Sequence, residues 1–276
     1  MNPLDKKTVL ITGASSGIGL ETARAFGRRG CRVALAARRT EKLTALSEDL
    51  KKLDVETLIL SCDVRDKEQS KNAVEDVVKA WGNLNILINC AGISDLQSFD
   101  HQNLDRIEDV INTNLLGTLY TTHAALPHMR RSKEGHILNV SSVAGLMGIP
   151  WMAAYSASKF AVVGFTEALR RELHGSGIRL TAFCPGTVDT AMAETPLQDE
   201  ALRKSIDPKT AEETAERIVR AILKEIPEDV YGEVSALQLR IMRFFPRLVD
   251  WAVHRIFTRK HPQVRELLQA EKADHS

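Results

Sequence analysis

The chain has 276 residues, 43% of them apolar, and a formal net charge of +1 at pH 7. This length suits one large or two small α/β domains, and the apolar share excludes a disordered chain. The near-neutral charge excludes a general nucleic-acid binder. The four cysteines lie far apart, which favours buried reduced thiols over disulfides or metal ligands. Residues 1–7 hold no apolar signal segment and no apolar run approaches about 18 residues, so we expect a cytoplasmic protein without a spanning helix.

Short apolar runs alternate with amphipathic patterns along most of the chain. The apolar runs predict strands at 8–11, 31–37, 55–62, 84–89, 135–141 and 177–184. Apolar residues three or four apart predict helices at 20–26, 40–50, 73–81, 107–129 and 154–173. This order predicts a Rossmann-type, doubly wound parallel α/β sheet of about seven strands, with helices on both faces. No linker rich in Pro, Gly or Ser interrupts it, so we expect one domain at 1–235 and an extra C-terminal helical segment at 236–276.

The stretch between the first predicted strand and helix is rich in glycine, with the sequence Thr12-Gly13-Ala14-Ser15-Ser16-Gly17-Ile18-Gly19. Its three glycines allow a sharp turn and a close approach of the backbone to a ligand. The amides at the start of the following helix would then face an anion, most naturally a pyrophosphate. The alternative is a plain strand-to-helix turn.

A second group of residues suggests proton transfer. Tyr155 and Lys159 are four apart in a predicted helix and therefore share a face. A nearby ammonium group favours the phenolate and lowers the pKa of Tyr155, which suits it to give a proton to a carbonyl or take one from an alcohol. Ser142 could reach the same substrate oxygen, and Asn114 has either a structural or a relay role. The alternatives are a solvated helix face for the pair and an ordinary loop or cap role for Ser142.

Several motifs occur together in one order: Thr-Gly-x-x-x-Gly-x-Gly at 12–19, Asn-x-Ala-Gly at 89–92, Asn114, Ser142, Tyr155-x-x-x-Lys159 and Pro185-Gly186. In this combination the chain resembles the short-chain dehydrogenase/reductase family over about residues 5–230. The resemblance implies a Rossmann fold that transfers hydride between a nicotinamide cofactor and a carbonyl or alcohol. Cys90 departs from the family pattern, in which many members have a second Asn, and we expect this change to be tolerated.

The resemblance also implies a role for individual residues. Tyr155 would be the general acid/base, and Lys159 would lower its pKa and hold the nicotinamide ribose. Ser142 would polarise the substrate oxygen, Asn114 would hold a relay water, and Asp63-Val64 would contact the adenine. The residues implied to bind the cofactor are Gly13, Ser15, Ser16, Gly17, Ile18, Gly19, Arg38, Arg39, Asp63, Val64, Asn89, Ala91, Gly92, Tyr155, Lys159, Pro185, Gly186, Val188 and Thr190.

The end of the second predicted strand indicates which cofactor is used. An enzyme that selects NAD has an acid there for the ribose 2′-hydroxyl, whereas this chain has Ala37-Arg38-Arg39 and no carboxylate before Glu41. The guanidinium of Arg38, with Ser15 or Arg39 assisting, suits an adenosine 2′-phosphate. We therefore predict NADP(H), with NAD(H) as the second choice; the alternative is that both arginines are solvated in a loop.

Three further segments concern the substrate and partners. The apolar stretch 144–152 contains two methionines and favours an apolar substrate, with 94–99 and the residues after Pro185 as further walls. Residues 191–206 are polar and aperiodic, which predicts a mobile lid. The tail at 237–260 is basic and amphipathic, which predicts either peripheral membrane contact or a helix that covers the substrate site or a partner subunit.

Together these features predict an NADP(H)-dependent oxidoreductase acting on an apolar carbonyl or secondary alcohol. Two alternatives stay open. One is an acyl-thioester ketoreductase, for which the arginines of the tail would form a docking surface. The other is a non-catalytic nucleotide-binding scaffold on the same fold. The resemblance further implies a homodimer or homotetramer formed partly through the helices at 107–129 and 154–173. No metal site is predicted.

Overall fold

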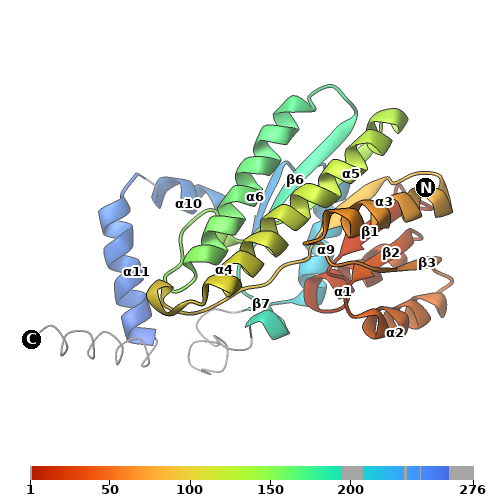
Figure 1. The fold of residues 1–276 in the computed structure, drawn as a ribbon. Coiled ribbons are helices and arrows are strands. Elements are labelled where there is room, and N and C mark those ends of the chain that lie inside the picture. Colours follow the sequence, from red (N-terminus) through yellow and green to blue (C-terminus); the bar gives the residue numbers. More distant parts are fainter. Residues whose placement is uncertain (1, 194–207, 233–234, 243, 261–276) are drawn as a thin grey trace, which may run out of the picture.

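The computed structural model of the protein describes residues 2–193, 208–232, 235–242 and 244–260. Its centre is a parallel sheet in the strand order β3-β2-β1-β4-β5-β6-β9 (Figure 1). The strands are β1 Thr8–Thr12, β2 Arg32–Ala37, β3 Thr57–Ser61, β4 Ile86–Asn89, β5 Gly135–Val140, β6 Ile178–Pro185 and β9 Glu228–Tyr231. The chain builds outward from β1 in one direction and then from β4 in the other. This confirms the predicted Rossmann-type, doubly wound sheet.

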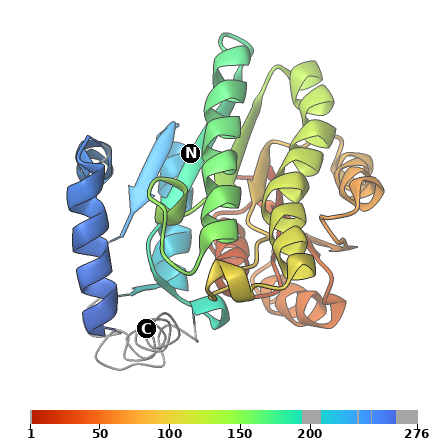
Figure 2. The same ribbon diagram turned by 60° about the vertical axis from the view of Figure 1, so that its left-hand side comes forward.

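Helices cover both faces of the sheet. One face packs against α1 Gly17–Gly27, α2 Thr40–Lys51 and α9 Ala211–Leu223, and the other against α3 Lys67–Trp81, α5 Gly117–Ser132 and α6 Ala153–Glu172 (Figure 2). The central strand β1 serves both faces because successive side chains alternate. Val9 and Ile11 belong to the first core cluster and Leu10 to the second, and all three are fully buried.

The helix predicted at 107–129 is divided into three parts. It begins earlier, as α4 Leu104–Ile111, passes through a π-helical turn, η2 Asn112–Leu116, and continues as α5. A π turn inserts an extra residue and redirects the side chains on it, a change that apolar spacing does not reveal. The helix predicted at 73–81 also begins earlier, at Lys67, because the Asp66 carboxylate accepts the amides of Glu68 and Gln69 and caps it.

The segment after β6 forms a small second sheet that the sequence did not predict. It consists of β7 Val188–Asp189 and β8 Lys209–Thr210. A short helix, η4 Ala191–Ala193, lies where the lid was expected. The rest of the expected lid, from 194 onward, lies outside the described residues.

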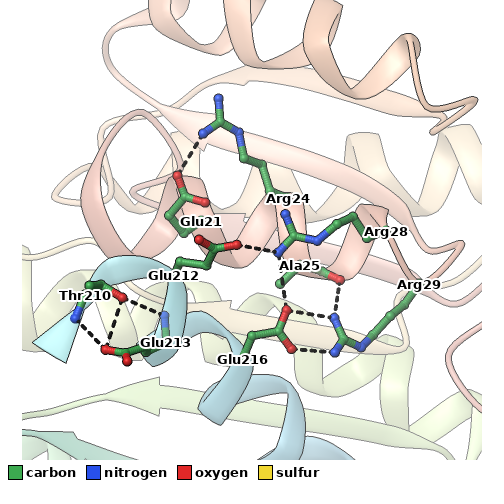
Figure 3. A network of polar contacts seen from close by, with 9 residues as sticks. All are labelled: Glu21, Arg24, Ala25, Arg28, Arg29, Thr210, Glu212, Glu213 and Glu216. Atoms are coloured by element: carbon green, nitrogen blue, oxygen red, sulfur yellow. Dashed lines mark hydrogen bonds and ion pairs between the residues drawn. The ribbon is translucent and has the colours of Figure 1, made fainter.

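Helices α1 and α9 lie side by side and are linked by ion pairs (Figure 3). Arg29 Nη2 is 2.5 Å from Glu216 Oε2, and Arg28 Nη2 is 3.3 Å from Glu216 Oε1. These groups are partly exposed, so each pair contributes less than about 1 kcal/mol. The buried side chains between the helices, such as Phe26 and Ile218, therefore contribute most of the contact energy.

The predicted C-terminal helical segment is present as two helices, α10 Ala236–Met242 and α11 Pro246–Lys260. Pro246 is the first residue of α11, a position where its missing amide costs no helical hydrogen bond. Figure 1 shows both helices at one end of the molecule, opposite α2 and β3. Of the helices in the described residues, none is both long and apolar enough to cross a bilayer.

Candidate active site

The predicted site residues lie at one edge of the sheet, at or just beyond the carboxyl ends of β1 to β6. Their positions are the turn after β1 (Gly13, Ser15, Ser16), the start of α1 (Gly17, Ile18, Gly19), the ends of β2 (Arg38, Arg39), β3 (Asp63, Val64) and β4 (Asn89, Ala91, Gly92), η2 (Asn114), the loop after β5 (Ser142), α6 (Tyr155, Lys159), and the end of β6 with β7 (Pro185, Gly186, Val188, Thr190). This is the edge where ligands bind in such sheets.

The glycine-rich turn is tied closely to the end of β4. Gly13 has φ +72°, and a Cβ atom on it would lie 2.8 Å from the backbone nitrogen of Ala91. A Cβ on Gly19 would lie 2.4 Å from the carbonyl oxygen of Gly13. The Thr12 hydroxyl accepts hydrogen bonds from the amides of Cys90 (3.1 Å) and Ala91 (3.2 Å). Only glycine fits both close approaches, so bare backbone forms the surface of this turn.

Helix α1 presents its first amides at the same edge. Ser16 is the N-cap residue, its side chain makes no capping hydrogen bond within the described residues, and the first turn holds no acid. A Cβ on Gly17 would lie 3.1 Å from the methyl carbon of Thr190, so the segment after β6 closes over the turn. Amides at the positive end of a helix dipole bind phosphate groups. These residues therefore fit the pyrophosphate of a dinucleotide.

The two arginines after β2 are both exposed, but they differ in position. Arg39 Nη2 donates hydrogen bonds to the hydroxyls of Ser15 and Ser16, each at 3.0 Å. Arg38 lies near Asp63 and helps to lower the pKa of that carboxyl. The sequence interpretation placed Arg38 first and Arg39 second, whereas in the structure Arg39 is the arginine that contacts the glycine-rich turn.

The predicted adenine contacts are fixed by neighbouring side chains. Arg65 donates to both carboxylate oxygens of Asp63, with Nη2 to Oδ2 at 2.7 Å, and also holds Asp109. The hydrogen bonds from Arg65 keep the pKa of Asp63 below its usual value. The Val64 side chain is buried against Gly117, where an added Cβ would lie 2.6 Å from it. Both positions after β3 are thus rigid.

The side chain of Asn89 is committed to the protein interior. Its Oδ1 accepts a hydrogen bond from Thr121 (2.6 Å), and its Nδ2 donates to Asn139 (2.8 Å) and Thr122 (3.0 Å). This buried network joins β4 and β5 to α5. Any contact of Asn89 with the cofactor would therefore come from its backbone, and this contact stays a prediction. Its amide supports the backbone that continues to Gly92, because every hydrogen-bonding group of the amide already has a partner.

Asn114 lies in the π turn and is almost fully buried. Its Oδ1 accepts the amide of Ile93 (2.8 Å), while its Nδ2 donates to the carbonyl of Ile93 (2.9 Å) and the hydroxyl of Ser158 (3.0 Å). An added Cβ on Gly92 would lie 3.2 Å from Asn114 Oδ1 and 3.5 Å from Lys159 Nζ. The π turn therefore brings Asn114, the end of β4 and α6 together.

Lys159 is a buried cation beside the tyrosine ring. Its Nζ donates to the carbonyl of Val140 at 2.9 Å and lies 5.6 Å from the centre of the Tyr155 ring. Burial lowers the pKa of Lys159 from 10.5 to about 8. The group is therefore mostly protonated at neutral pH, although this costs free energy.

Tyr155 and Ser142 form a hydrogen-bonded pair. Ser142 begins the short helix η3 Val143–Gly145, where its Oγ accepts the amide of Ala144 at 3.1 Å. Burial raises the pKa of Tyr155, and its hydrogen bond with Ser142 acts in the opposite direction. Burial has the larger effect, so the pKa of Tyr155 lies above its ordinary value in this structure, and the expected effect of Lys159 on it stays a prediction. At neutral pH Tyr155 carries its proton.

The segment after β6 is held in place from β9 and the glycine-rich turn. The Gly186 amide donates to the carbonyl of Tyr231 at 2.7 Å, and an added Cβ on Gly232 would lie 2.9 Å from Gly186 Cα. Val188 is buried in β7, and Thr190 follows it against the turn. The segment thus runs from Pro185, whose carbonyl accepts a hydrogen bond from Ser142, to the start of α1.

Comparison with known proteins agrees with this geometry. A family model described as short chain dehydrogenase matches residues 7–201, more than half of the chain. The chain belongs to the short-chain dehydrogenase/reductase family. This short-chain dehydrogenase/reductase is therefore an oxidoreductase that uses a nicotinamide dinucleotide.

Three known proteins show the extent of the similarity. Dehydrogenase/reductase SDR family protein 7-like from Drosophila melanogaster is 36% identical over 264 residues, covering 91% of this chain and 80% of that protein. Ketoacyl reductase HetN from Nostoc sp. is 31% identical over 257 residues, covering 91% and 89%. The crystal structure of a short chain dehydrogenase/reductase from Burkholderia phymatum in complex with NAD has a TM-score of 0.80 at 26% identity, covering 90% of this chain and 96% of that one.

Sequence reasoning missed Ser158, and it gave no role to Thr12 of the glycine-rich motif; both residues organise the site of this short-chain dehydrogenase/reductase. Ser158 donates to the carbonyl of Tyr155 (2.7 Å) and accepts from Asn114, and Thr12 bridges β1 to β4. Ser158 lies three residues after Tyr155, so helical spacing could have placed it on the same side of α6. Within the described ranges no group of three or more His, Cys, Asp or Glu side chains could hold a metal ion.

Proposed function

We propose that this short-chain dehydrogenase/reductase is an NADP(H)-dependent enzyme that interconverts an apolar carbonyl compound and its secondary alcohol, with Tyr155 as the general acid/base. The observation that carries the proposal is the convergence of four side chains from separate elements. They are Asn114 from η2, Ser142 from the loop after β5, and Tyr155 and Lys159 from α6.

Each of these residues has a distinct part in the proposed reaction. The protonated phenol of Tyr155 suits proton donation to a carbonyl oxygen, and Ser142, which is hydrogen-bonded to it, can bind the same oxygen. The ammonium of Lys159 stabilises the phenolate once the proton has left. Asn114 holds the backbone at Ile93 and the hydroxyl of Ser158, and so fixes both sides of the site. The bound nicotinamide supplies or accepts the hydride.

The choice of NADP(H) rests on charge at the end of β2. No acid follows this strand before Glu41, and Arg39 lies against Ser15 and Ser16 at the phosphate-binding turn. A guanidinium with adjacent hydroxyls suits a 2′-phosphate, whereas a 2′-hydroxyl would call for a carboxylate.

The proposed assembly is a homodimer or homotetramer in the cytoplasm. All four cysteines have free thiols, which supports a reducing compartment.

A second candidate substrate class is an acyl thioester with a 3-oxo group. The similarity to a ketoacyl reductase over 91% of this chain favours it, as does the basic tail. A non-catalytic nucleotide-binding scaffold is disfavoured, because the reactive side chains are all present and connected.

The test uses Tyr155→Phe, with Tyr120→Phe as the matched loss of a hydroxyl elsewhere. Oxidation of NADPH is followed by absorbance with cyclohexanone, acetophenone and an acetoacetyl thioester, and NADPH binding by fluorescence. We expect Tyr155→Phe to lower kcat by about a hundredfold to ten-thousandfold while NADPH binding is kept, because only the proton donor is lost. Retained turnover in Tyr155→Phe would exclude Tyr155 as the acid. Wild-type NADPH binding without turnover of any substrate would favour the scaffold, and turnover of the thioester alone would select the ketoreductase.

A further inference from the structure

The C-terminal helices expose an unusual concentration of apolar side chains. Thirteen large apolar side chains are exposed in the described residues, and six of them lie within 237–251. These six, which we call the C-terminal apolar face, are Leu237, Ile241, Phe244, Phe245, Leu248 and Trp251. The most exposed is Phe244, at 80%, where the chain passes from α10 to α11. Soluble monomers rarely expose such a group without a binding partner.

The opposite side of these helices already contacts the body of the protein. Leu239 of α10 is 3% exposed. Asp250, Val253 and His254 of α11 line a cavity of about 580 Å³ together with residues 148–151 and the start of α6. Leu237 and Ile241 are four apart in α10, and Leu248 and Trp251 three apart in α11, so each pair shares one outward face. The apolar face is therefore the side of α10 and α11 turned away from the fold.

The net charge of residues 240–260 indicates which kind of surface could bind the C-terminal apolar face. Between 240 and 260 the sequence has six basic residues and one acid, a net charge of +5; the basic residues are Arg240, Arg243, Arg247, Arg255, Arg259 and Lys260, and the acid is Asp250. A second copy meeting this segment across a two-fold axis would bring two such charges together. An anionic surface would neutralise them instead.

The residue types on the face also fit a lipid interface. Arg255 Cζ lies 5.4 Å from the centre of the Trp251 ring, an arrangement that keeps the cation and the aromatic ring at the same level. Helices that lie in a membrane surface combine exposed Trp, Phe and Leu with Arg or Lys beside them. From these observations we infer that α10 and α11 form a peripheral membrane-binding element that takes anionic lipid headgroups with its arginines and acyl chains with the C-terminal apolar face.

The loop expected to wall the substrate site lies on the opposite side of α11 from the apolar face, across the cavity lined by Asp250, Val253 and His254. The membrane inference itself does not depend on the proposed reaction.

The test measures flotation of the full-length protein with phosphatidylcholine vesicles, with and without phosphatidylglycerol. We expect flotation with the anionic vesicles, weakened by high salt and by omission of phosphatidylglycerol. In the double variant Phe244→Glu/Trp251→Glu the bound fraction should fall by about tenfold or more, because both apolar contacts are replaced by charges of the same sign as the lipid. Arg247→Glu, which keeps the apolar face, should also weaken binding.

The control is Leu53→Glu/Leu223→Glu, which places the same charges at two exposed leucines outside α10 and α11. It should float like the wild type. The inference is overturned if the wild type stays soluble with anionic vesicles, or if Phe244→Glu/Trp251→Glu floats as well as the control. It is also overturned if light scattering shows that this double variant only turns a dimer into a monomer, in which case the face binds a second copy. Thermal melting checks that each variant is folded, and no readout requires turnover.

Discussion

Burial controls the protonation of Tyr155 and Lys159, the two titratable side chains of the proposed site. It lowers the pKa of Lys159 to about 8 and raises that of Tyr155. Both shifts oppose the charged form of the group. At neutral pH the site therefore holds the protonated phenol of Tyr155 beside the ammonium group of Lys159, and burial destabilises the charged form of that ammonium group.

Because burial destabilises the charged form of Lys159, we expect that removing this charge stabilises the fold. The pKa of Lys159 falls from 10.5 to about 8 on folding. At about 1.4 kcal/mol per pH unit, this difference destabilises the folded protein by about 3 kcal/mol at any pH below 8. Lys159→Met should abolish activity and yet raise the free energy of unfolding at pH 7 by about 1–2 kcal/mol, after about 1 kcal/mol is lost at the carbonyl of Val140. Urea unfolding measures this value.

The sign of the pH dependence provides the check on this prediction. Between pH 8 and 10.5 the unfolded wild type binds more protons at this site than the folded protein, so wild-type stability rises with pH and the advantage of Lys159→Met fades. The exposed Lys79→Met should show no such trend relative to the wild type. A pH-independent difference between Lys159→Met and wild type would contradict the assignment.

Arg39 should contribute more than Arg38 to the choice of cofactor. Its guanidinium is held beside Ser15 and Ser16. Arg39→Ala should lower the ratio of kcat/KM for NADPH to that for NADH by about tenfold to a hundredfold, the loss of one charged hydrogen bond, and Arg38→Ala should lower it less. Arg32→Ala, at the other end of β2, is the matched control. An unchanged ratio in both variants at 38 and 39 would argue against NADP(H).

At the scale of elements, α9 links the cofactor half of the molecule to the segment after β6. It packs on α1, and its cap residue Thr210 belongs to β8, which pairs with β7. The capping box is complete: the Thr210 hydroxyl accepts the amide of Glu213 at 3.0 Å, and the Glu213 carboxylate accepts the amide of Thr210 at 3.0 Å (Figure 3).

Loss of this cap should destabilise the protein measurably. Thr210→Ala removes the acceptor at the N-cap and should lower the free energy of unfolding by about 1 kcal/mol, or about 2–4 °C in Tm. Thr44→Ala, within the exposed part of α2, should change it by less than about 0.5 kcal/mol. Equal melting temperatures for the two variants would show that the capping box contributes little.

Two segments, 107–129 and 89–92, show why sequence patterns could predict only part of the site. The apolar spacing across 107–129 is continuous, so nothing in it marks the π turn that aims Asn114. Similarly, the motif at 89–92 indicates the end of β4 but not that the Asn89 amide turns inward to Thr121 and Asn139. Those directions are decided by partners far away in the chain.

The stability of the whole molecule at acidic pH should depend in part on one buried histidine. His136 Nε2 lies 2.8 Å from the hydroxyl of Thr181, which donates its own hydrogen to the carbonyl of Ile226, so Nε2 of His136 is the donor. Burial lowers its pKa to about 4; the nearby Glu225 acts to raise it, and Arg179 acts to lower it.

Acidification should therefore cost the wild type stability through this site. Because the folded pKa of about 4 is below the ordinary 6.5, the unfolded chain binds more protons between these values, and stability falls by about 2 kcal/mol from pH 7 to 5. His136→Gln should lose less over that range in urea unfolding, whereas the exposed His174→Gln should follow the wild type. Parallel curves for wild type and His136→Gln would contradict the buried, neutral state.

Local patterns in the chain were enough for the alternating strands and helices, the glycine-rich turn and a basic amphipathic tail, whereas Ser142, Tyr155 and Lys159 were singled out by the combination of motifs. These features depend on residue spacing and on backbone freedom at single positions, both of which are local. Packing alone decided that burial raises the pKa of Tyr155, that Arg39 reaches the turn, and that the apolar side of α10 and α11 faces outward. A pKa, a side-chain partner and an exposed face each depend on groups brought together from distant parts of the chain, and only the folded arrangement brings them together.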